Sequence, residues 1–418
     1  MSKAQNSILG DLSMLPKLWV LMVTAFVEMI GFALVIPLLP LYAQRFGATA
    51  TTIGFLMAAF ALGGMIMAPI WGRVSDFVGR KPVMLAGQAI AACAFLVFAY
   101  ADSVLLLFVC RFLQGVGAGS IGSINAYVSD AVEPAERAQA LGWITACTSL
   151  GVMVGPWLAS QTVAYSYAAP GLIAAGASVV NLVFTAIWLR EMRDPNSRPS
   201  KPQGIRRQAA VVIQHPTRTV SSLIWVYTAG MMAFMAMTGM MALYLSGRFG
   251  ITETEIGHYY MGLGAASFVM RALILGPTVR RFGEVRTLRS GALCLGIGML
   301  GMGFAPNLWL FVVAMALAPI GTAFLFPSTT SLISRHSDPD EVGQTMGLQQ
   351  AFGGISRLLA PIWAGFVFDR LGMAVPFWIG GAVVLSVGLL SLRLRPGAAP
   401  KAPPPDAPVD ASADASTA

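Results

Sequence analysis

The sequence predicts an all-α membrane protein whose twelve transmembrane helices form two six-helix bundles. Of the 418 residues, 56% are hydrophobic and 11% are charged, whereas about a quarter of the residues in an ordinary soluble domain are charged. The mean hydropathy of +0.70 leaves too little polar surface to cover a large soluble core. The apolar residues form runs long enough to cross a bilayer, and the two halves of the chain resemble each other. These observations exclude a soluble enzyme.

The apolar runs define the expected spans. A helix needs about 20 mostly apolar residues to cross the hydrocarbon core. The first run is too long for a signal peptide and has no cleavage site behind it, so we expect it to remain in the mature protein. The expected spans cover residues 18–41, 52–71, 82–100, 104–127, 138–161, 168–189, 220–245, 256–277, 287–304, 308–331, 342–367 and 373–392.

The positive charges predict the orientation, because Lys and Arg are retained on the cytoplasmic side. With the N-terminus inside, the inner segments, together with Arg289 at the inner end of the ninth span, hold 21 of the 27 Lys and Arg residues, the outer loops hold three and the interiors of the spans hold three. We therefore expect both termini in the cytoplasm. The expected domains are an N-terminal segment (1–17), a six-helix bundle (18–189), a polar linker (190–219), a second bundle (220–392) and a disordered tail (393–418) rich in Pro and Ala.

An internal repeat relates the two halves. RFGATATTIG at 45–54 and RFGITETEIG at 248–257 agree at seven of ten positions, and Pro156 in the fifth span corresponds to Pro361 in the eleventh. Two related bundles in the same orientation are typical of secondary transporters, whose substrate site lies at the midplane between the halves.

The loop after the second span carries the sequence GRVSDFVGRK, with Gly72, Asp76, Gly79, Arg80 and Lys81. The glycines allow a tight turn between helices, and the acid and the two cations can form charge-assisted bonds and contact helix ends. Simple retention of positive charge in the cytoplasm is the alternative, but it leaves Asp76 unused.

The fifth span carries GVMVGPWLAS. Gly151 and Gly155 have the spacing that lets two membrane helices approach closely, and Pro156 removes a backbone hydrogen bond and bends the span. Ordinary helix packing is the alternative to a functional role.

Two charged residues lie inside spans of the first half. Glu28 is the carboxylate placed in the middle of a span, about 16 Å from its inner end, and Arg111 lies about 20 Å from the inner face. A buried arginine costs about 2.5 kcal/mol or more unless it faces a partner or a cavity, so we expect the two to reach one another. Burial favours the neutral carboxyl, whereas a nearby cation favours the carboxylate. The pair is therefore the expected proton-coupling site; a purely structural ion pair is the alternative.

The walls of a central cavity are predicted less directly. Methionines of the seventh span fill irregular space around varied ligands, although such a stripe is also typical of a core. Arg357 could hold an anionic part of a substrate or pair with carbonyls. The expected cavity residues are Phe32, Asn125, Met231, Met235, Gln350 and Arg357.

Metal and nucleic-acid sites are not expected. The four cysteines lie inside apolar runs without C-x-x-C spacing, and the three histidines are far apart along the chain. The charges lie in short gaps between apolar runs, which does not match a nucleic-acid patch.

Together these motifs resemble the major facilitator superfamily over residues 18–392. They are most similar to the twelve-span drug/proton antiporters, including the tetracycline exporters. The resemblance implies that the loop after the second span is a latch that holds one end closed, and that the fifth span carries the antiporter motif. Ala159 and Ser160 stand where that motif ends in two glycines, but both residues are small.

The resemblance also implies a function: proton-coupled export of amphipathic drugs or a secreted metabolite by alternating access, and hence antibiotic resistance. The proton gradient would supply the energy without a cofactor, and the expected partners are a small-molecule substrate, protons and lipid. We expect a monomer in a bacterial plasma (inner) membrane. A proton-coupled uptake symporter and an uncoupled facilitator remain open. A membrane enzyme or scaffold would need a nucleophile, a metal cluster or a large soluble domain, and the sequence contains no sign of these.

Overall fold

The computed structural model describes residues 3–118, 121–132, 136–191, 205–337 and 341–393. The helices of the first half are α1 (Lys3–Arg45), α2 (Ala50–Val78), α3 (Arg80–Ala99), α4 (Val104–Ala118), α5 (Ile121–Ala131), α6 (Arg137–Val163) and α7 (Ala169–Trp188). The linker contains α8 (Ile205–Gln214). The helices of the second half are α9 (Thr219–Phe249), α10 (Glu253–Val269), a π-helical turn (Met270–Ile274), α11 (Leu275–Phe282), α12 (Glu284–Phe304), α13 (Leu308–Met315), α14 (Leu317–His336), α15 (Val342–Leu371), α16 (Val375–Gly388) and a 3-10 turn (Leu389–Arg393).

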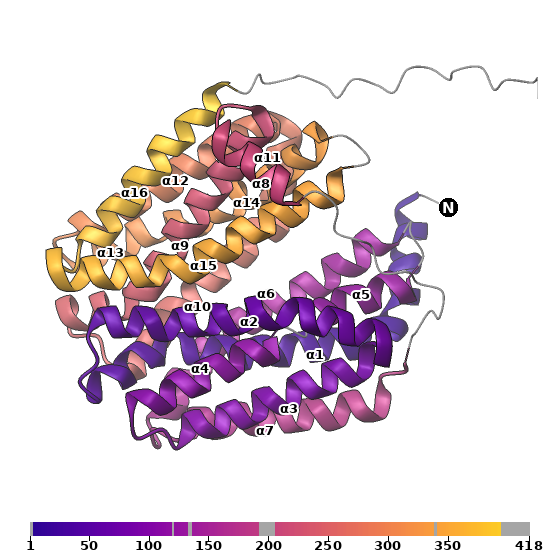
Figure 1. Ribbon diagram of the computed structural model, residues 1–418, viewed down its shortest axis with the longest axis horizontal. Coiled ribbons are helices and arrows are strands. Elements are labelled where there is room, and N and C mark those ends of the chain that lie inside the picture. The colour runs from indigo at the N-terminus through magenta and orange to yellow at the C-terminus, as the bar shows by residue number, and fades with distance from the viewer. Residues whose placement is uncertain (1–2, 119–120, 133–135, 192–204, 338–340, 394–418) are drawn as a thin grey trace, which may run out of the picture.

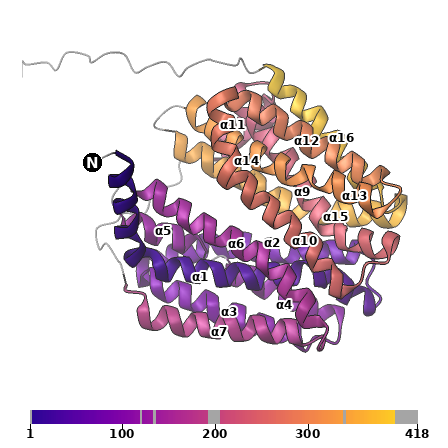
Figure 2. The ribbon, with the colours of Figure 1, turned by 180° about the vertical axis from the view of Figure 1, so that it is seen from behind.

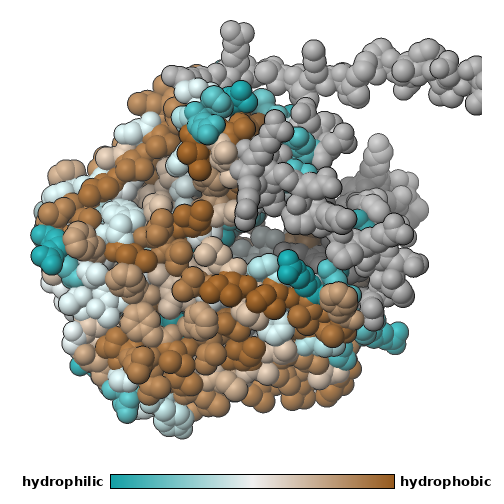
Figure 3. Space-filling model, viewed as in Figure 1, coloured by the Kyte–Doolittle hydropathy of each residue, from teal (hydrophilic) through white to brown (hydrophobic). Residues whose placement is uncertain are grey.

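The twelve expected spans are confirmed. Within the described ranges, twelve helical segments are long and apolar enough to cross a membrane, and each coincides with an expected run. Large apolar side chains cover their outer faces (Figure 3), and Phe77, Leu105 and Trp309 are each 72% exposed. Such a surface requires lipid around it. The tail expected to be disordered lies outside the described residues from 394 onward.

The two halves form two bundles that meet at one end and diverge at the other (Figure 1). α1 to α7 form the first bundle and α9 to α16 the second, and α2 packs on α15 while α6 packs on α10. The view from behind shows the same divergence toward the N-terminus (Figure 2). We call the end with the N-terminus the open end, and the end with loops 46–49 and 250–252 the closed end.

The backbone confirms the internal repeat. Gly47 and Gly250, which occupy matching positions, have φ angles of 75° and 69°, and Gly79 and Gly283 have φ angles of 102° and 80°. Only glycine adopts such angles without a steric cost. The same turn therefore follows the first helix of each half, and the same turn joins the second helix to the third.

The closed end is sealed by direct backbone contact between the bundles. A Cβ atom on Gly54 of α2 would overlap the carbonyl oxygen of Pro361 on α15, and a Cβ atom on Gly257 of α10 would overlap that of Pro156 on α6. The two glycines end the matching repeat sequences, and the two prolines also correspond. The repeat therefore builds the same contact twice.

Polar contacts strengthen this seal. The Asp369 carboxylate of α15 accepts hydrogen bonds from the backbone N–H groups of Ala50 and Thr51, at 3.0 and 2.7 Å, and from the Thr51 hydroxyl at 2.6 Å. A carboxylate at a helix N-terminus satisfies free N–H groups and favours the helix dipole. Arg45 of α1 forms an ion pair with Glu253 of α10, 3.2 Å apart. Asp369 was not singled out from the sequence.

We expect Gly257→Val to open the closed end, because a side chain there cannot coexist with the Pro156 carbonyl. The measurement is the distance between spin labels carried by unnatural amino acids at positions 44 and 254. The matched control is Gly262→Val on the same helix, where a Cβ atom would meet nothing within 4 Å. Equal label distances in both variants would contradict the role of this contact.

Candidate functional site

A cavity of about 1160 Å³ lies between the bundles, visible as a hollow beside the grey atoms in Figure 3. It exceeds the roughly 300–1,000 Å³ of most ligand pockets. The first bundle contributes α1 to α5, and the lining residues of the second bundle all lie on α15. Most of the lining is apolar or glycine. The polar side chains on its wall are those of Glu28, Ser75, Arg80, Gln88, Gln114, Ser123, Gln350 and Arg357.

Glu28 supplies the one carboxylate among the described lining residues of this cavity. Its Oε1 atom accepts a hydrogen bond from Gln88 Nε2 of α3 at 3.4 Å. The same amide nitrogen donates to the Thr185 hydroxyl of α7 at 3.1 Å, and Thr185 in turn bonds to Thr24 of α1 at 3.1 Å. This network holds the Glu28 side chain from the side of the first bundle and leaves the cavity side free for a ligand.

Arg111 does not form the expected ion pair with Glu28 within the described residues. It is 4% exposed, its Nη1 atom donates to Gln114 Oε1 at 2.7 Å, and its guanidinium lies 4.8 Å from the centre of the Phe60 ring. Arg111 therefore points toward α2, whereas Glu28 points toward α3. A neutral amide and the face of an aromatic ring, a cation–π contact, replace the predicted carboxylate.

Unpaired polar atoms gather around the cavity. Gln88 Oε1, Gln114 Nε2 and Arg111 Nε are buried without a hydrogen-bond partner, and Gln88 and Gln114 both line the cavity. Buried polar atoms are nearly always hydrogen-bonded to protein, water or a ligand. These amides, which the sequence analysis passed over, are therefore candidate ligand contacts. Their signal in the sequence is a glutamine inside an apolar run.

The GRVSDFVGRK loop wraps around a carboxylate that was not predicted from the sequence. Arg80 forms an ion pair with Asp76 at 2.8 Å. The backbone N–H groups of Arg80 and Lys81 donate to Glu191 at 2.9 and 3.1 Å, so Glu191 caps the N-terminus of α3. A Cβ atom on Gly79 would lie 2.6 Å from that carboxylate. These contacts lie within the first bundle, at the open end.

The expectation that Gly72 shapes this turn is wrong. Gly72 lies inside α2, on the cavity wall, and a Cβ atom there would meet nothing within 4 Å. Gly79 alone provides the turn. The role of the loop as a latch between bundles stays a prediction.

The motif of the fifth span contacts both bundles. Cβ atoms on Gly151 and Gly155 of α6 would lie 2.6 and 2.7 Å from the carbonyl oxygens of Phe26 and Ile30, on either side of Glu28 in α1. Ser160, which replaces a family glycine, accepts a hydrogen bond from the Gly257 N–H at 2.7 Å and donates one to the Glu253 carbonyl at 2.9 Å. The motif thus links the helical turn of α1 that carries Glu28 to the second bundle.

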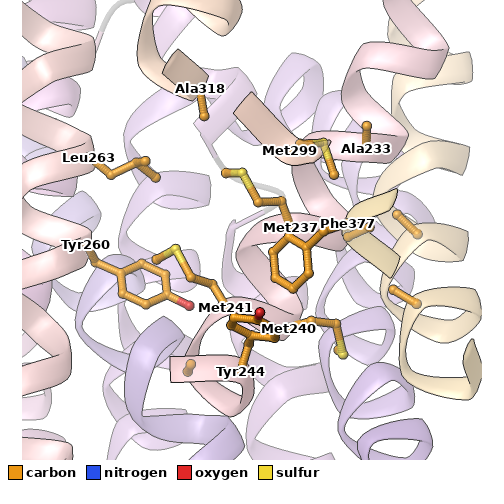
Figure 4. Close-up of a cluster of buried hydrophobic side chains, with 14 of the residues drawn as sticks. Ala233, Met237, Met240, Met241, Tyr244, Tyr260, Leu263, Met299, Ala318 and Phe377 are labelled. Atoms are coloured by element: carbon orange, nitrogen blue, oxygen red, sulfur yellow. The ribbon is translucent and has the colours of Figure 1, made fainter. Parts of the chain in front are cut away.

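The predicted cavity residues divide into two groups. Phe32, Gln350 and Arg357 line the cavity. The side chain of Asn125, on α5, lies outside what the structure describes. Met231 and Met235 are not on the wall: Met231 is 8% exposed, and Met235 packs against the main apolar cluster. Their neighbours Met237, Met240 and Met241 are buried among Tyr244, Met299 and Phe377 (Figure 4). The prediction that the methionine stripe lines the cavity is therefore wrong in this conformation, because α9 directs it into the core of its own bundle.

Two bundles that meet at one end and hold a cavity open at the other define a membrane transporter that works by alternating access. A family model described as Major Facilitator Superfamily matches residues 21–274 and 231–416. The chain belongs to this superfamily, and it is a transporter, not an enzyme.

Relatives and solved structures agree with this assignment. The chain is 25% identical over 364 residues to the tetracycline resistance protein class B of Escherichia coli, covering 86% of this chain and 89% of that protein. It is 25% identical over 378 residues to multidrug resistance protein 1 of Bacillus subtilis (strain 168), covering 89% and 94%. The crystal structure of the human organic anion transporter MFSD10 (TETRAN) has the same fold, with a TM-score of 0.67 and 21% identity over 90% of this chain and 98% of that one.

The twelve spans and the bacterial relatives make the chain a multi-pass protein of the inner membrane.

We expect Glu191→Gln to destabilise the protein by about 1 kcal/mol, because the cap of α3 loses its charge. The measurement is thermal unfolding in detergent. The matched control is Glu136→Gln, because Glu136 occupies the N-cap position of α6 but its side chain makes no capping hydrogen bond. Equal unfolding temperatures for the two variants would rule out a stabilising cap.

Proposed function

We propose that this transporter exports amphipathic, often cationic, organic molecules from the cytoplasm in exchange for protons, and that Glu28 binds the proton. The observation that carries the proposal is that Glu28 is the one carboxylate among the described residues on the wall of a large, mostly apolar cavity. Apolar walls accept many shapes, and a few polar groups orient the ligand. The tetracycline and multidrug resistance proteins among its relatives support drugs as the substrate class and export as the direction.

Competition at Glu28 would couple the two fluxes. An ionised Glu28 attracts a cationic substrate, and protonation removes that attraction. An ionised carboxylate without a bound ligand is costly in the membrane interior. The transporter would therefore switch between its inward-open and outward-open conformations only when Glu28 carries either a substrate or a proton. This rule produces exchange, because each direction of the conformational change is tied to one of the two ligands.

The conformation fits the loading step of such a cycle. The cavity extends to Ser75 and Arg80, at the end where the bundles diverge and where the N-terminus lies (Figure 1). The distribution of Lys and Arg favours the N-terminus in the cytoplasm. The substrate would enter from the cytoplasm while the closed end is sealed. Breaking the seal, and forming a new one at the open end around the GRVSDFVGRK loop, would release the substrate outside. We propose that one chain performs this cycle as a monomer, with the proton gradient as its energy source.

We expect Glu28→Gln to abolish proton-coupled export, because a neutral amide cannot exchange a proton. In inverted membrane vesicles, dyes and tetracycline should dissipate the pH gradient with the parent and not with the variant. Glu28→Asp keeps the charge and should retain coupling. Ligand affinity of the parent should fall as the pH falls, since the proton competes for Glu28, whereas affinity of the glutamine variant should not change with pH.

Two outcomes would contradict the proposal. If Glu28→Gln couples as well as the parent, another group binds the proton. If substrate enters together with protons, the transporter is an uptake symporter.

A further inference from the structure

A second, smaller cavity touches Glu28 from another side. It has a volume of about 170 Å³ and lies between α1, α5 and α6. It shares Glu28 and Met29 with the central cavity. Its remaining lining residues are Ala25, Ile124, Ile144, Thr145 and Thr148. Glu28 thus lies in the wall that separates two spaces of very different size.

The small cavity suits water and not a drug. Its volume is below the roughly 300 Å³ of the smallest ligand pockets, but it has room for about five water molecules at some 30 Å³ each. Buried water needs two to four polar partners, and the Glu28 carboxylate and the hydroxyls of Thr145 and Thr148 supply them.

The two hydroxyls are arranged to accept hydrogen bonds from water. Thr145 donates its hydroxyl proton to the Leu141 carbonyl and Thr148 donates to the Thr145 carbonyl, both at 2.8 Å. Each hydroxyl oxygen keeps lone pairs for a donor from the cavity. The two hydroxyls and the Glu28 carboxylate therefore offer hydrogen-bond acceptors for water within one cavity.

The small cavity is partly open beside Thr145 and closed off beside Gly151. Thr145 is exposed and Thr148 is half-buried. Gly151, three residues further along α6, is pressed against α1, where its Cβ atom would lie 2.6 Å from the Phe26 carbonyl. Because α6 runs from the open end to the closed end, the route from Thr145 to Glu28 faces the open end.

The charged groups around Glu28 lie away from this route. Arg80 and Arg357 line the central cavity but not the small one. Arg111 is bound to Gln114 and Phe60, and Cys147 of α6 and Tyr127 of α5 are not among the residues that line the small cavity. Among the described residues that line the small cavity, none is a cation.

We propose that the small cavity is the proton-access route of Glu28, separate from the substrate cavity. The inference rests on the proposed role of Glu28 in proton exchange. It adds that Thr145 and Thr148 position the water that carries the proton, so that the proton can leave Glu28 while a substrate fills the central cavity. Binding of one ligand then does not block the exit of the other.

The test measures proton transfer without a substrate. After a pH jump on the purified protein in nanodiscs, the carboxyl infrared band that is absent in Glu28→Gln reports protonation of Glu28. We expect the double variant Thr145→Val and Thr148→Val to slow its appearance several-fold, and the double variant Thr145→Ser and Thr148→Ser to restore it. A role in packing alone would not be rescued in this way, because serine restores the hydroxyl but not the methyl group.

The control separates this route from general effects on α6. Thr162→Val removes a hydroxyl of the same helix that donates to the Leu158 and Ala159 carbonyls and does not line the small cavity, so the rate should not change. Gly354→Trp places a large side chain in the central cavity, where a Cβ atom meets nothing within 4 Å, and should leave the rate of protonation close to that of the parent.

The proposal would be overturned if Glu28 is protonated at the parent's rate in the double valine variant, or if Gly354→Trp strongly slows that protonation. This outcome is distinct from failure of the proposed function, which is judged by dye efflux with Glu28→Gln. Coupled efflux in that variant would contradict the antiport proposal whatever the infrared rates are.

Discussion

Direct contact between helix backbones at the closed end is the constraint on which the rest of the structure depends. Gly54 meets the Pro361 carbonyl and Gly257 meets the Pro156 carbonyl, so the two bundles touch there with no side chain between them. Because the bundles are joined at this end, their divergence at the other end creates the cavity. The same helix α6 that forms one of these contacts also presses on α1 beside Glu28, and so the seal and the proposed proton site share one rigid element.

The site itself is asymmetric, although the scaffold is a repeat. The first bundle supplies the carboxylate and the buried amides, whereas the second bundle contributes lining residues of α15, including Arg357. Met231 occupies the position in the second half that Glu28 has in the first, and it is buried in the core of its own bundle. Duplication therefore preserved the parts that make the bundles meet, and the chemistry diverged between the halves. This division fits a transporter in which one bundle binds the proton and the other closes over the ligand.

The sequence was sufficient to predict the spans and the internal repeat, because hydrophobic runs and glycine-dependent turns are local properties of the chain. It also predicted Phe32, Gln350 and Arg357 as cavity residues, and all three line the cavity. The prediction from sequence failed where the direction of a side chain depends on the rotation of its helix about the helix axis. The depth of Glu28 and Arg111 in the membrane can be counted along the chain, but the direction of each side chain cannot, and Arg111 turned toward Phe60. Glu191 and Asp369 were missed because a carboxylate near the end of a span is unremarkable until the helix N-terminus it caps is known.

If Glu28, the one carboxylate among the described lining residues of the cavity, binds the proton as proposed, it also limits which part of the proton-motive force can drive transport. Moving one charge across the membrane is worth about 2.3 kcal/mol per 100 mV. Exchange of one proton at Glu28 for a substrate with a single positive charge moves no net charge, so the membrane potential does no work and the pH difference alone supplies the energy. A neutral substrate exchanged for the same proton draws on both. Substrates of different charge would therefore be concentrated to different extents by the same protein, even if they bound equally well.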